Sequence, residues 1–263
     1  MLAKRRQSVI LAEVRRAGSV RVGELSLRFG VSDMTIRRDL SDLARQGLVE
    51  KVHGGALLSD AVSRIEPGFE AKTEWDPEAK DEIAQAAAAL VRPGTAIALS
   101  AGTTTHALAR HLLRVQRLTV VTNSVRVADV FEEARRPGRT GPVVVLTGGV
   151  RTPSDALVGP IAALALHDLH VDQLFMGCHG IDQDAGLTTP NLAESETNRA
   201  LMGCASQVVV LADHSKWGMV SLSSYAPLSA VDTLITDEAM PAATREAAAA
   251  TVGRLVVAAA PAR

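Results

Sequence analysis

Residues 31–47 read V-S-D-M-T-I-R-R-D-L-S-D-L-A-R-Q-G, and this stretch decides the fold of the N-terminal part of the chain. On a helical wheel of about 100° per residue, its apolar face comprises Ile36, Leu40 and Leu43. The opposite face comprises Met34, Arg38, Ser41 and Arg45. We therefore predict an amphipathic helix that buries one face and offers two arginines on the other, with Arg37 at the boundary.

The ends of this helix carry the expected signals. Ser32 stands where its hydroxyl can accept a backbone N–H of the first turn, and Asp33 places a negative charge at the positive end of the helix dipole. Gly47 supplies the stop. A short helix of this kind after a Gly-Val-Ser turn is typical of the recognition helix of a helix-turn-helix protein.

The flanking segments complete a small domain. Apolar residues at helical spacing predict helices over residues 4–17 and 22–29. Residues 48–52 alternate like a strand, break at His53-Gly54-Gly55 and are followed by a second apolar run at residues 56–58. Three helices and a hairpin are the arrangement of a winged helix-turn-helix, which we assign to residues 1–58.

The chain has a basic head and an acidic body. Residues 1–58 contain 11 Lys and Arg against 6 Asp and Glu, whereas the rest of the 263 residues contain 17 against 23. This division indicates a nucleic-acid contact confined to the head, because the acidic body repels phosphates. Chance is the alternative explanation when charge is considered alone.

Several other classes of protein are disfavoured. No apolar run reaches the ~18–20 residues that span a bilayer, and the start lacks the apolar segment of a secretory signal, so we expect a cytoplasmic protein. Cys178 and Cys204 are too few for a disulfide framework. The seven histidines show no zinc spacing, so no metal and no cofactor are expected.

Residues 59–76, with mixed charges and the pair Pro67-Gly68, are assigned as a linker. From residue 77, helices alternate with short runs that are apolar on both faces. The predicted strands are residues 95–99, 118–122, 143–147, 173–176, 208–212, 233–236 and 255–258, and the main helices are residues 78–90, 104–113, 125–133, 161–167 and 193–204. This pattern predicts one open, mostly parallel α/β sheet over residues 77–263, covered by helices.

Polar, glycine-rich turns follow five of the predicted strands. They are residues 100–105, 122–124, 147–151, 177–182 and 213–216. In open parallel sheets, ligands bind beyond the carboxyl ends of the strands, where these turns lie. The first turn suits an anion best, because it combines a flexible glycine, three hydroxyls and the free N–H groups of a helix N-terminus.

The segments V-S-D-M-T-I-R-R-D-L and G-L-V-E-K-V-H-G-G-A resemble the N-terminal signature of the DeoR family of bacterial repressors. The resemblance implies a winged helix that binds double-stranded operator DNA. The predicted DNA-contacting residues are Ser32, Met34, Thr35, Arg37, Arg38, Arg45 and His53. The alternative is that the arginines only solvate the helix surface and reach neither phosphates nor base edges.

The series G-T-T-T, V-V-T-N-S, L-T-G-G, G-x-x-G-I-D, G-L-T-T and D-H-S-K resembles the DeoR-family sensor domain. The resemblance implies a fold similar to ribose-5-phosphate isomerase and a phosphorylated sugar as effector. It implies that the phosphate is held by Gly102, Thr103, Thr104 and Thr105, the sugar hydroxyls by Asn123 and Ser124, and that Lys216 adds positive charge. Further candidates are Ser100, Gly149, Arg151, Gly180 and Glu194. It also implies that Phe69 and Lys72 anchor the linker on the sensor; for Asn123, capping a helix is the alternative role.

Two residues depart from the family pattern. Ser100 stands where the family commonly has Asp, and Asn198 stands where it often has Lys, which leaves the identity of the effector open. A sugar-phosphate isomerase needs a base beside the carbonyl carbon and a group that stabilises the enediolate. The remaining carboxylates, Asp182, Glu194 and Asp213, form no evident set, so we expect no enzymatic activity.

Our interpretation is a DNA-binding transcriptional regulator, a repressor of a carbohydrate-metabolism operon that a phosphorylated sugar releases from its operator. We expect a homo-oligomer, a dimer or tetramer, because specific DNA sites are usually read in pairs. Two alternatives stay open. One is a sugar-phosphate isomerase-like enzyme with an appended DNA-binding domain, and the other is a DNA-binding protein whose second domain only oligomerises.

Overall fold

The computed structural model describes residues 3–17, 19–45, 48–52, 54–58, 68–135 and 141–259. The chain divides into two compact units, Met1–Glu66 and Pro67–Arg263. The second unit thus begins at Pro67 rather than at residue 77, because a short helix within the predicted linker belongs to it. None of the helices in the described ranges is long and apolar enough to cross a membrane.

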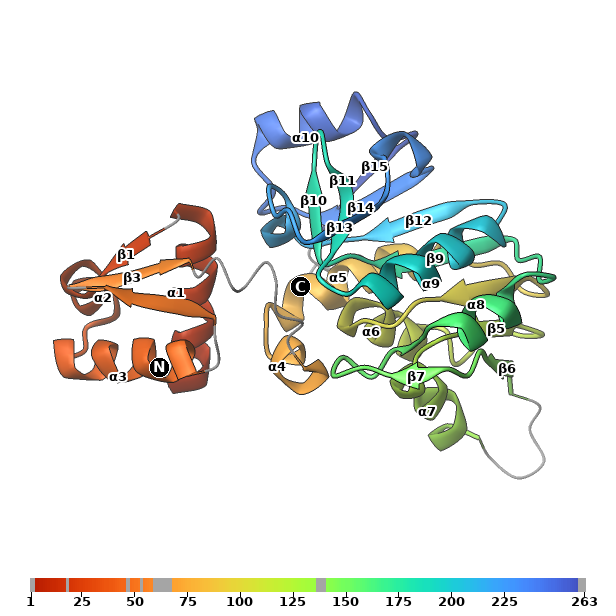
Figure 1. Cartoon of the computed structure of the whole chain (residues 1–263), viewed down its shortest axis with the longest axis horizontal. Coiled ribbons are helices and arrows are strands. Elements are labelled where there is room, and N and C mark those ends of the chain that lie inside the picture. The colour runs from red at the N-terminus through yellow and green to blue at the C-terminus, as the bar shows by residue number, and fades with distance from the viewer. Residues whose placement is uncertain are drawn as a thin grey trace. The chain divides into compact units, whose positions relative to one another are not determined.

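Among the described residues, the first unit contains three helices and a three-stranded antiparallel sheet with the order β1-β3-β2 (Figure 1). Its elements are α1 (Ala3–Ala17), β1 (Ser19–Arg21), α2 (Val22–Phe29), α3 (Asp33–Arg45), β2 (Val49–Val52) and β3 (Gly55–Leu58). The predicted winged helix-turn-helix is confirmed, with a third strand that the sequence did not predict.

The third strand, β1, pairs with β3 so that Val20 lies opposite Ala56. Gly55 approaches β1 so closely that a Cβ there would lie 2.0 Å from the carbonyl oxygen of Val20. Only glycine allows this approach of the two backbones. A strand of three residues shows too little alternation for its sequence to reveal it.

Helix α3 has the predicted amphipathic arrangement. Ile36, Leu40 and Leu43 are at most 3% exposed and form part of the core of the first unit. Ser32 caps the helix, since its Oγ accepts a hydrogen bond from the backbone N–H of Thr35 at 3.3 Å.

A buried ion pair holds α1 against α3. Asp39, which the helical wheel did not assign to the core, is only 3% exposed. Arg6 Nε donates to Asp39 Oδ2 at 2.6 Å, and Gln7 Nε2 donates to Asp39 Oδ1 at 3.1 Å. Removing one partner of such a pair leaves an uncompensated buried charge, so the contact fixes how α3 is presented.

The second unit contains the larger sheet. Its helices are α4 (Phe69–Thr73), α5 (Pro77–Ala88), α6 (Thr103–His111), α7 (Val125–Glu133), α8 (Pro160–Leu166), α9 (Leu192–Gly203), α10 (Ala242–Ala249) and the 3-10 turns η1 (His214–Lys216) and η2 (Leu228–Ala230). Its main strands are β4 (Ala96–Leu99), β5 (Thr119–Thr122), β6 (Val143–Leu146), β9 (Gln173–Gly177), β12 (Val208–Leu211), β14 (Thr233–Asp237) and β15 (Leu255–Ala258).

These seven strands form a parallel sheet with the order β15-β14-β12-β9-β4-β5-β6. The chain proceeds from β4 toward β6 on one side and then returns to build β9 to β15 on the other. The order therefore reverses between β4 and β9, which is where open α/β sheets bind ligands. The predicted fold class is confirmed.

Two cores lie on opposite faces of the sheet, as strands with two apolar faces require. On one face, Leu99, Val120 and Phe175 pack among residues of α5, α6 and α7. On the other face, Ala98 and Met176 pack among residues of α8, α9 and α10 and of a small second sheet.

The small sheet contains segments that the sequence analysis treated as turns. It is antiparallel with the order β10-β11-β13, where β10 is Gly180–Asp182, β11 is Gly186–Thr189 and β13 is Ser223–Ala226. A two-stranded ribbon, β7 (Val150–Arg151) with β8 (Leu157–Val158), was likewise not predicted.

Candidate DNA-binding surface and ligand site

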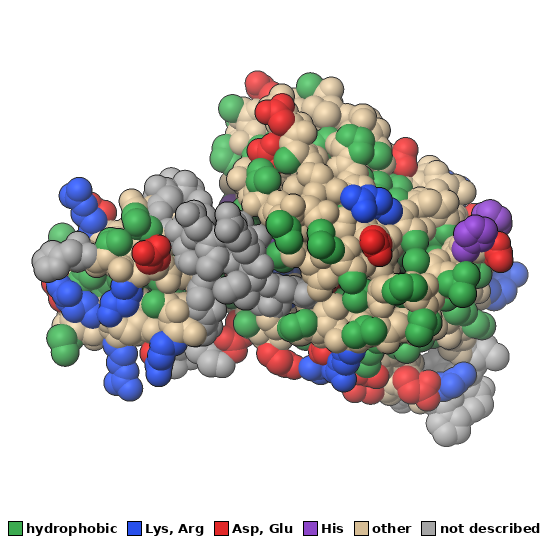
Figure 2. Space-filling model, in the orientation of Figure 1, with side chains coloured by type: hydrophobic (Ala, Val, Ile, Leu, Met, Phe, Trp, Pro, Cys, Tyr) green, Lys and Arg blue, Asp and Glu red, His purple; other side chains and the backbone are tan. Residues whose placement is uncertain are grey.

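The outward face of α3 is the candidate DNA-binding surface. Arg37 and Arg38 are both exposed, so Arg37 belongs to this face rather than to its boundary, and Met34 is 76% exposed. Figure 2 shows Lys and Arg side chains projecting from the first unit. Two free guanidinium groups on a capped helix are suited to phosphates and to guanine edges.

The other residues predicted to contact DNA are placed differently. Ser32 Oγ and Thr35 Oγ1 lie 3.0 Å apart and hydrogen bond to each other at the start of α3. Arg45 is exposed but forms an ion pair with Asp42 on its own helix, so it must leave that pair to reach DNA. His53 lies outside the described residues.

Lys51 on β2 is a basic residue of this surface that the sequence analysis missed. Its Nζ donates to Ser41 Oγ at 2.9 Å and so brings a wing cation beside the polar face of α3. The alternation of the wing strand could not have revealed it, because Lys51 and the buried Val49 are two residues apart and share one side of a regular strand.

The first strand-end turn of the second unit leads into α6. Thr103 begins that helix and is half-buried, whereas Thr104 is 7% exposed and Thr105 is fully buried. Thr105 Oγ1 donates to the carbonyl oxygen of Gly102 at 3.0 Å, which fixes the turn. The first N–H groups of α6 have no partner within the helix, and they therefore favour an anion at this end.

The hydroxyls of Ser100 and Ser124, which were predicted to bind the effector, form hydrogen bonds within the protein. Ser100 Oγ accepts a hydrogen bond from the backbone N–H of Gly177 at 3.2 Å and so joins the ends of β4 and β9. Ser124 Oγ accepts one from the N–H of Val127 at 3.2 Å and caps α7. Both serines are at most 2% exposed.

Asn123 has a structural role of a different kind from the helix cap considered as its alternative. Its Oδ1 accepts a hydrogen bond from the N–H of Ala101 at 2.8 Å, and its Nδ2 donates to the carbonyl oxygen of Leu157 at 3.1 Å. The side chain is 2% exposed. Asn123 thus ties the first strand-end turn to β8.

Two of the three predicted glycines, Gly149 and Gly180, serve close packing. Gly149 has φ +121°, and a Cβ there would lie 2.6 Å from the carbonyl oxygen of Val158. Gly180 lies in β10, where a Cβ would be 2.2 Å from the carbonyl oxygen of Met219. Neither backbone position accommodates a larger residue.

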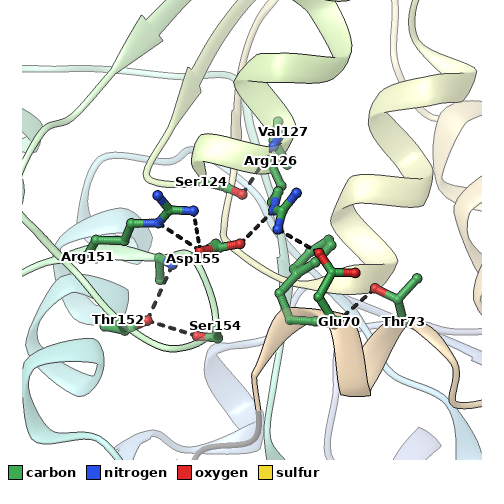
Figure 3. A network of polar contacts seen from close by, with 11 residues as sticks. Glu70, Thr73, Ser124, Arg126, Val127, Arg151, Thr152, Ser154 and Asp155 are labelled. Atoms are coloured by element: carbon green, nitrogen blue, oxygen red, sulfur yellow. Dashed lines mark hydrogen bonds and ion pairs between the residues drawn. The ribbon is translucent and has the colours of Figure 1, made fainter.

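Arg151 belongs to a network of charged groups (Figure 3). Its Nε donates to Asp155 Oδ1 at 2.7 Å, and Arg126 Nε donates to Asp155 Oδ2 at 2.6 Å. Arg126 also forms an ion pair with α4, where its Nη2 lies 2.7 Å from Glu70 Oε1. The network therefore links a predicted effector residue to the first helix of the second unit.

Asp155 is the centre of this network. Burial alone would raise the pKa of its carboxyl group, but the hydrogen bonds from Arg126 and Arg151 lower that pKa below its ordinary value. Its φ of +60° is one that side chains other than Asn and Asp rarely adopt. The residue is thus held in a constrained conformation between two guanidinium groups.

Lys216 lies at the end of β12 with two buried groups. Burial raises the pKa of Asp213, but the attraction of Lys216, the hydrogen bond from Ser215 and the charges of Lys80 and His214 together lower it to about 2. Burial raises the pKa of the Cys178 thiol to about 12. Lys216 Nζ also lies 5.8 Å from the ring centre of Trp75, just beyond α4.

His214 and Asp237 form a second charged pair at these strand ends. His214 Nδ1 lies 2.7 Å from Asp237 Oδ2, and this hydrogen bond raises the pKa of the imidazole despite burial. Burial opposes ionisation of Asp237, but the contact with His214 lowers its pKa overall. Within the described ranges, no group of three His, Cys, Asp or Glu side chains could hold a metal ion.

Glu194, a further candidate, is engaged at the start of α9. Its Oε1 accepts a hydrogen bond from Ser154 Oγ at 3.0 Å, and its Oε2 accepts one from Thr189 Oγ1 at 2.8 Å. These contacts connect α9 to the Asp155 loop and to β11.

Helix α4 is a further element near the site that the sequence analysis did not predict. Phe69 is 6% exposed, its N–H donates to the carbonyl oxygen of Pro153 at 3.3 Å, and its ring meets His106 edge-on at 5.3 Å. Lys80, buried in α5, donates to the carbonyl oxygen of Lys72 at 2.6 Å at the end of α4. The anchoring expected of Phe69 and Lys72 thus uses a ring and a backbone carbonyl.

Comparison with known proteins decides the family. The DeoR-like helix-turn-helix domain matches residues 6–62, and the DeoR C-terminal sensor domain matches residues 75–238. The chain belongs to the DeoR family. As in other DeoR-family proteins, a DNA-binding domain and a sensor domain are joined in one transcriptional regulator.

Relatives align over nearly the whole chain. The transcriptional regulator GlpR of Haloferax volcanii is 36% identical over 247 residues, 94% of each chain. The repressor CsqR of Escherichia coli K12 is 31% identical, covering 90% of this chain and 89% of its own length. The lactose phosphotransferase system repressor of Streptococcus mutans is 32% identical, covering 90% and 93%.

A solved structure, ribose 5-phosphate isomerase A from Methanocaldococcus jannaschii, is similar to this DeoR-family chain at 19% identity. It covers 52% of this chain and 53% of its own, with a TM-score of 0.37.

The exposed guanidinium of Arg38 gives a test of the DNA-binding surface. Replacing Arg38 with alanine should weaken binding of the full-length chain to a duplex selected by the wild type from a random pool. A lost guanine contact costs about 1–3 kcal/mol, and a lost phosphate contact lowers the salt slope by about one. Arg92→Ala, an exposed arginine of the second unit, is the control for net charge; equal affinities of the Arg38→Ala variant and the wild type would contradict the assignment.

The His214–Asp237 pair predicts a pH dependence of stability. Because the folded state raises the pKa of His214, its contribution is complete below pH ~6.5 and is lost as the pH rises through the folded value. The free energy of unfolding, measured with urea between pH 6 and 9, should fall less steeply in Asp237→Asn than in the wild type, by on the order of 1 kcal/mol over the range.

The exposed pair His167–Asp168 is the matched control, since its two atoms are also 2.8 Å apart but both side chains face water. Asp168→Asn should keep the wild-type pH dependence, because exposed pairs contribute little. Identical curves for the wild type and Asp237→Asn would show that the buried pair does not set the slope.

Proposed function

We propose that this DeoR-family regulator represses a carbohydrate-metabolism operon and leaves its operator when a phosphorylated sugar binds the second unit. The observation that carries the proposal is that the α6 N-terminus, Arg151 and Lys216 follow β4, β6 and β12, three strands of one parallel sheet whose carboxyl ends lie at the same edge. The names of the relatives support it, since one is a lactose phosphotransferase system repressor. A regulator of this kind acts on DNA in the cytoplasm.

The phosphate of the effector is proposed to lie at the first turn of α6. The backbone N–H groups of residues 103–105 and the hydroxyls of Thr103 and Thr104 would bind it, and Gly102 leaves the backbone open to it. Arg151 and Lys216 would add charge-assisted hydrogen bonds. Ser100, Asn123 and Ser124 would shape the pocket rather than contact the sugar, because their hydrogen-bonding groups already bind the protein.

Release from DNA would follow from reciprocal coupling. If the effector weakens DNA binding by a given factor, DNA weakens effector binding by the same factor. The affinity for the effector and the affinity for DNA therefore both depend on one coupling free energy, and each can be measured.

Among the described residues, two carboxylates considered for the isomerase alternative, Asp213 and Glu194, are poorly suited to act as its base. A base that abstracts a proton near neutral pH works best with a pKa close to 7. Asp213, with a pKa of about 2 and hydrogen bonds to Ser215, is a weak base. Both carboxylate oxygens of Glu194 already accept hydrogen bonds, from the hydroxyls of Ser154 and Thr189. We therefore propose that the sensor binds its sugar phosphate without converting it.

Thr103→Glu tests the phosphate site. A glutamate at the first turn of α6 interacts favourably with the positive end of the helix dipole, so the substitution should preserve the fold. Its negative charge, however, repels a phosphate. We expect pentose and hexose phosphates to raise the melting temperature of the wild type by mass action, and this rise to be lost in Thr103→Glu.

Ala243→Glu, which places the same charge in the first turn of α10, should respond like the wild type. An undiminished rise in Thr103→Glu would remove the phosphate site from α6. Steady conversion of a sugar phosphate by the purified chain would favour the isomerase.

We further propose that the second unit self-associates through an apolar face formed by β6, β7 and α8. Its exposed side chains include Val143, Val145, Val150, Ile161 and Leu164. A standard interface buries about 800 Å² per partner, and these side chains would form its apolar centre. β6 is an edge strand without charged residues, and an edge of this kind is usually covered. A second copy is the occupant proposed, because paired subunits read paired DNA half-sites.

Leu164→Arg tests the self-association. Leu164 is 77% exposed, so the substitution should spare the folded chain but place a charge in the interface. We expect sedimentation to show a lower molecular mass for this variant than for the wild type. Leu222→Arg, at a residue 65% exposed on the β13 side, should sediment like the wild type. A monomeric wild type, or an unchanged Leu164→Arg mass, would contradict the proposal.

A further inference from the structure

Helix α4 is the first element of the second unit, which begins at Pro67. We propose that an anion bound by Arg151 loosens α4 through the ion-pair series Arg151–Asp155–Arg126–Glu70, so that effector occupancy reaches the chain segment leading to the DNA-binding unit. In this inference, which rests on the proposed function, Asp155, Arg126 and Glu70 are positioning residues.

Arg126 is the group that holds α4. Its guanidinium binds Glu70 Oε1 at 2.7 Å and lies 5.1 Å from the ring centre of Phe69, so two of its contacts are with α4. Its third contact is the 2.6 Å hydrogen bond to Asp155. One cation is thus shared between a helix and a buried carboxylate, as Figure 3 shows.

Arg151 is the accessible member of the series. Its side chain is 55% exposed, whereas that of Asp155 is 10% exposed. A phosphate offers Arg151 two charge-assisted hydrogen bonds and competes with Asp155 for it. When Arg151 turns to the phosphate, the Asp155 carboxylate is left with Arg126 as its guanidinium partner in the network.

The weakest contact of Arg126 is the one with α4. The Glu70 side chain is 80% exposed, so water replaces its ion pair at little cost, whereas the largely buried Asp155 needs a cation. Arg126 therefore moves toward Asp155 and away from Glu70 when Arg151 is withdrawn. Helix α4 then loses the ion pair between Arg126 and Glu70 and is held by fewer contacts.

A second contact acts in the same direction. Lys216, the other cation proposed to bind the effector, lies over the Trp75 ring just after α4. A phosphate that attracts both Arg151 and Lys216 weakens the support of the α4 segment at both ends. The effect of Arg151 reaches Glu70 through Arg126, and Lys216 itself leaves Trp75. Residues 69–75 are thus the part of the sensor whose support depends on the occupancy of the site.

Hydrogen exchange of the full-length chain, with inorganic phosphate as the probe, tests the inference. We expect phosphate to slow the exchange of residues 103–106, where it binds, and to accelerate that of residues 69–75. Slower exchange at residues 103–106 with unchanged or slower exchange at residues 69–75 would overturn the inference alone. No slowing at residues 103–106 would overturn the phosphate site and the inference together.

Asp155→Asn separates a positioning role from a structural one. Asparagine tolerates the φ of +60° at this residue, so the loop should keep its conformation. Because Arg151 loses its competing carboxylate, phosphate affinity should rise on the order of fivefold, while the response of residues 69–75 disappears. An affinity that is unchanged or lower, or a response that persists, would contradict the series.

Glu70→Gln tests the α4 end at an exposed residue. Residues 69–75 should exchange faster than in the wild type before phosphate is added, and phosphate affinity should rise, because Arg126 is then free to satisfy Asp155 and releases Arg151. Glu133→Gln, which removes an exposed carboxylate at the end of α7, is the matched control and should exchange like the wild type. If residues 69–75 of Glu70→Gln exchange hydrogen at the wild-type rate, the inference is overturned.

Discussion

The order of strands in the parallel sheet is the constraint on which the second unit depends. Because the chain builds β4, β5 and β6 outward and then returns to place β9 beside β4, the turns after these strands meet at one edge. The strands are apolar on both faces, so helices and the small sheet cover them, and that edge is where polar groups can gather. The strand order thus determines where the site lies, and the side chains at that edge determine what it can bind.

Much of this fold could be predicted because its elements repeat a simple pattern. The strands of the large sheet are short apolar runs, and α3 shows its buried face in Ile36, Leu40 and Leu43. The elements that were missed are short, and two of them, β10 and β11, begin with a glycine. β10 begins with Gly180, which reads as a turn residue but is required by the close approach of Met219. β1 has only three residues and gains its partner from a strand more than thirty residues later in the chain.

The candidate site was predictable in its residue types but less so in their orientation. Asn123 and Ser124 lie after the strand where they were expected, yet their polar atoms bind the backbone, because a sharp turn between buried elements must satisfy its own donors and acceptors. Arg151 was a candidate, but its partner Asp155 depends on a positive φ that spacing alone does not reveal. Sequence patterns identify which residues reach an edge, and three-dimensional hydrogen bonding decides which remain available.

The thiol of Cys178, a residue that is only partly buried, has a consequence for the chemistry of the ligand edge. With a pKa of about 12, the sulfur stays protonated at cellular pH, and the thiol is far less reactive than the thiolate toward peroxides, electrophiles and soft metals. The cysteine therefore sits at the ligand edge as an inert apolar group. At this position the ligand edge therefore presents an uncharged sulfur, which can pack against a ligand but adds no charge to the site.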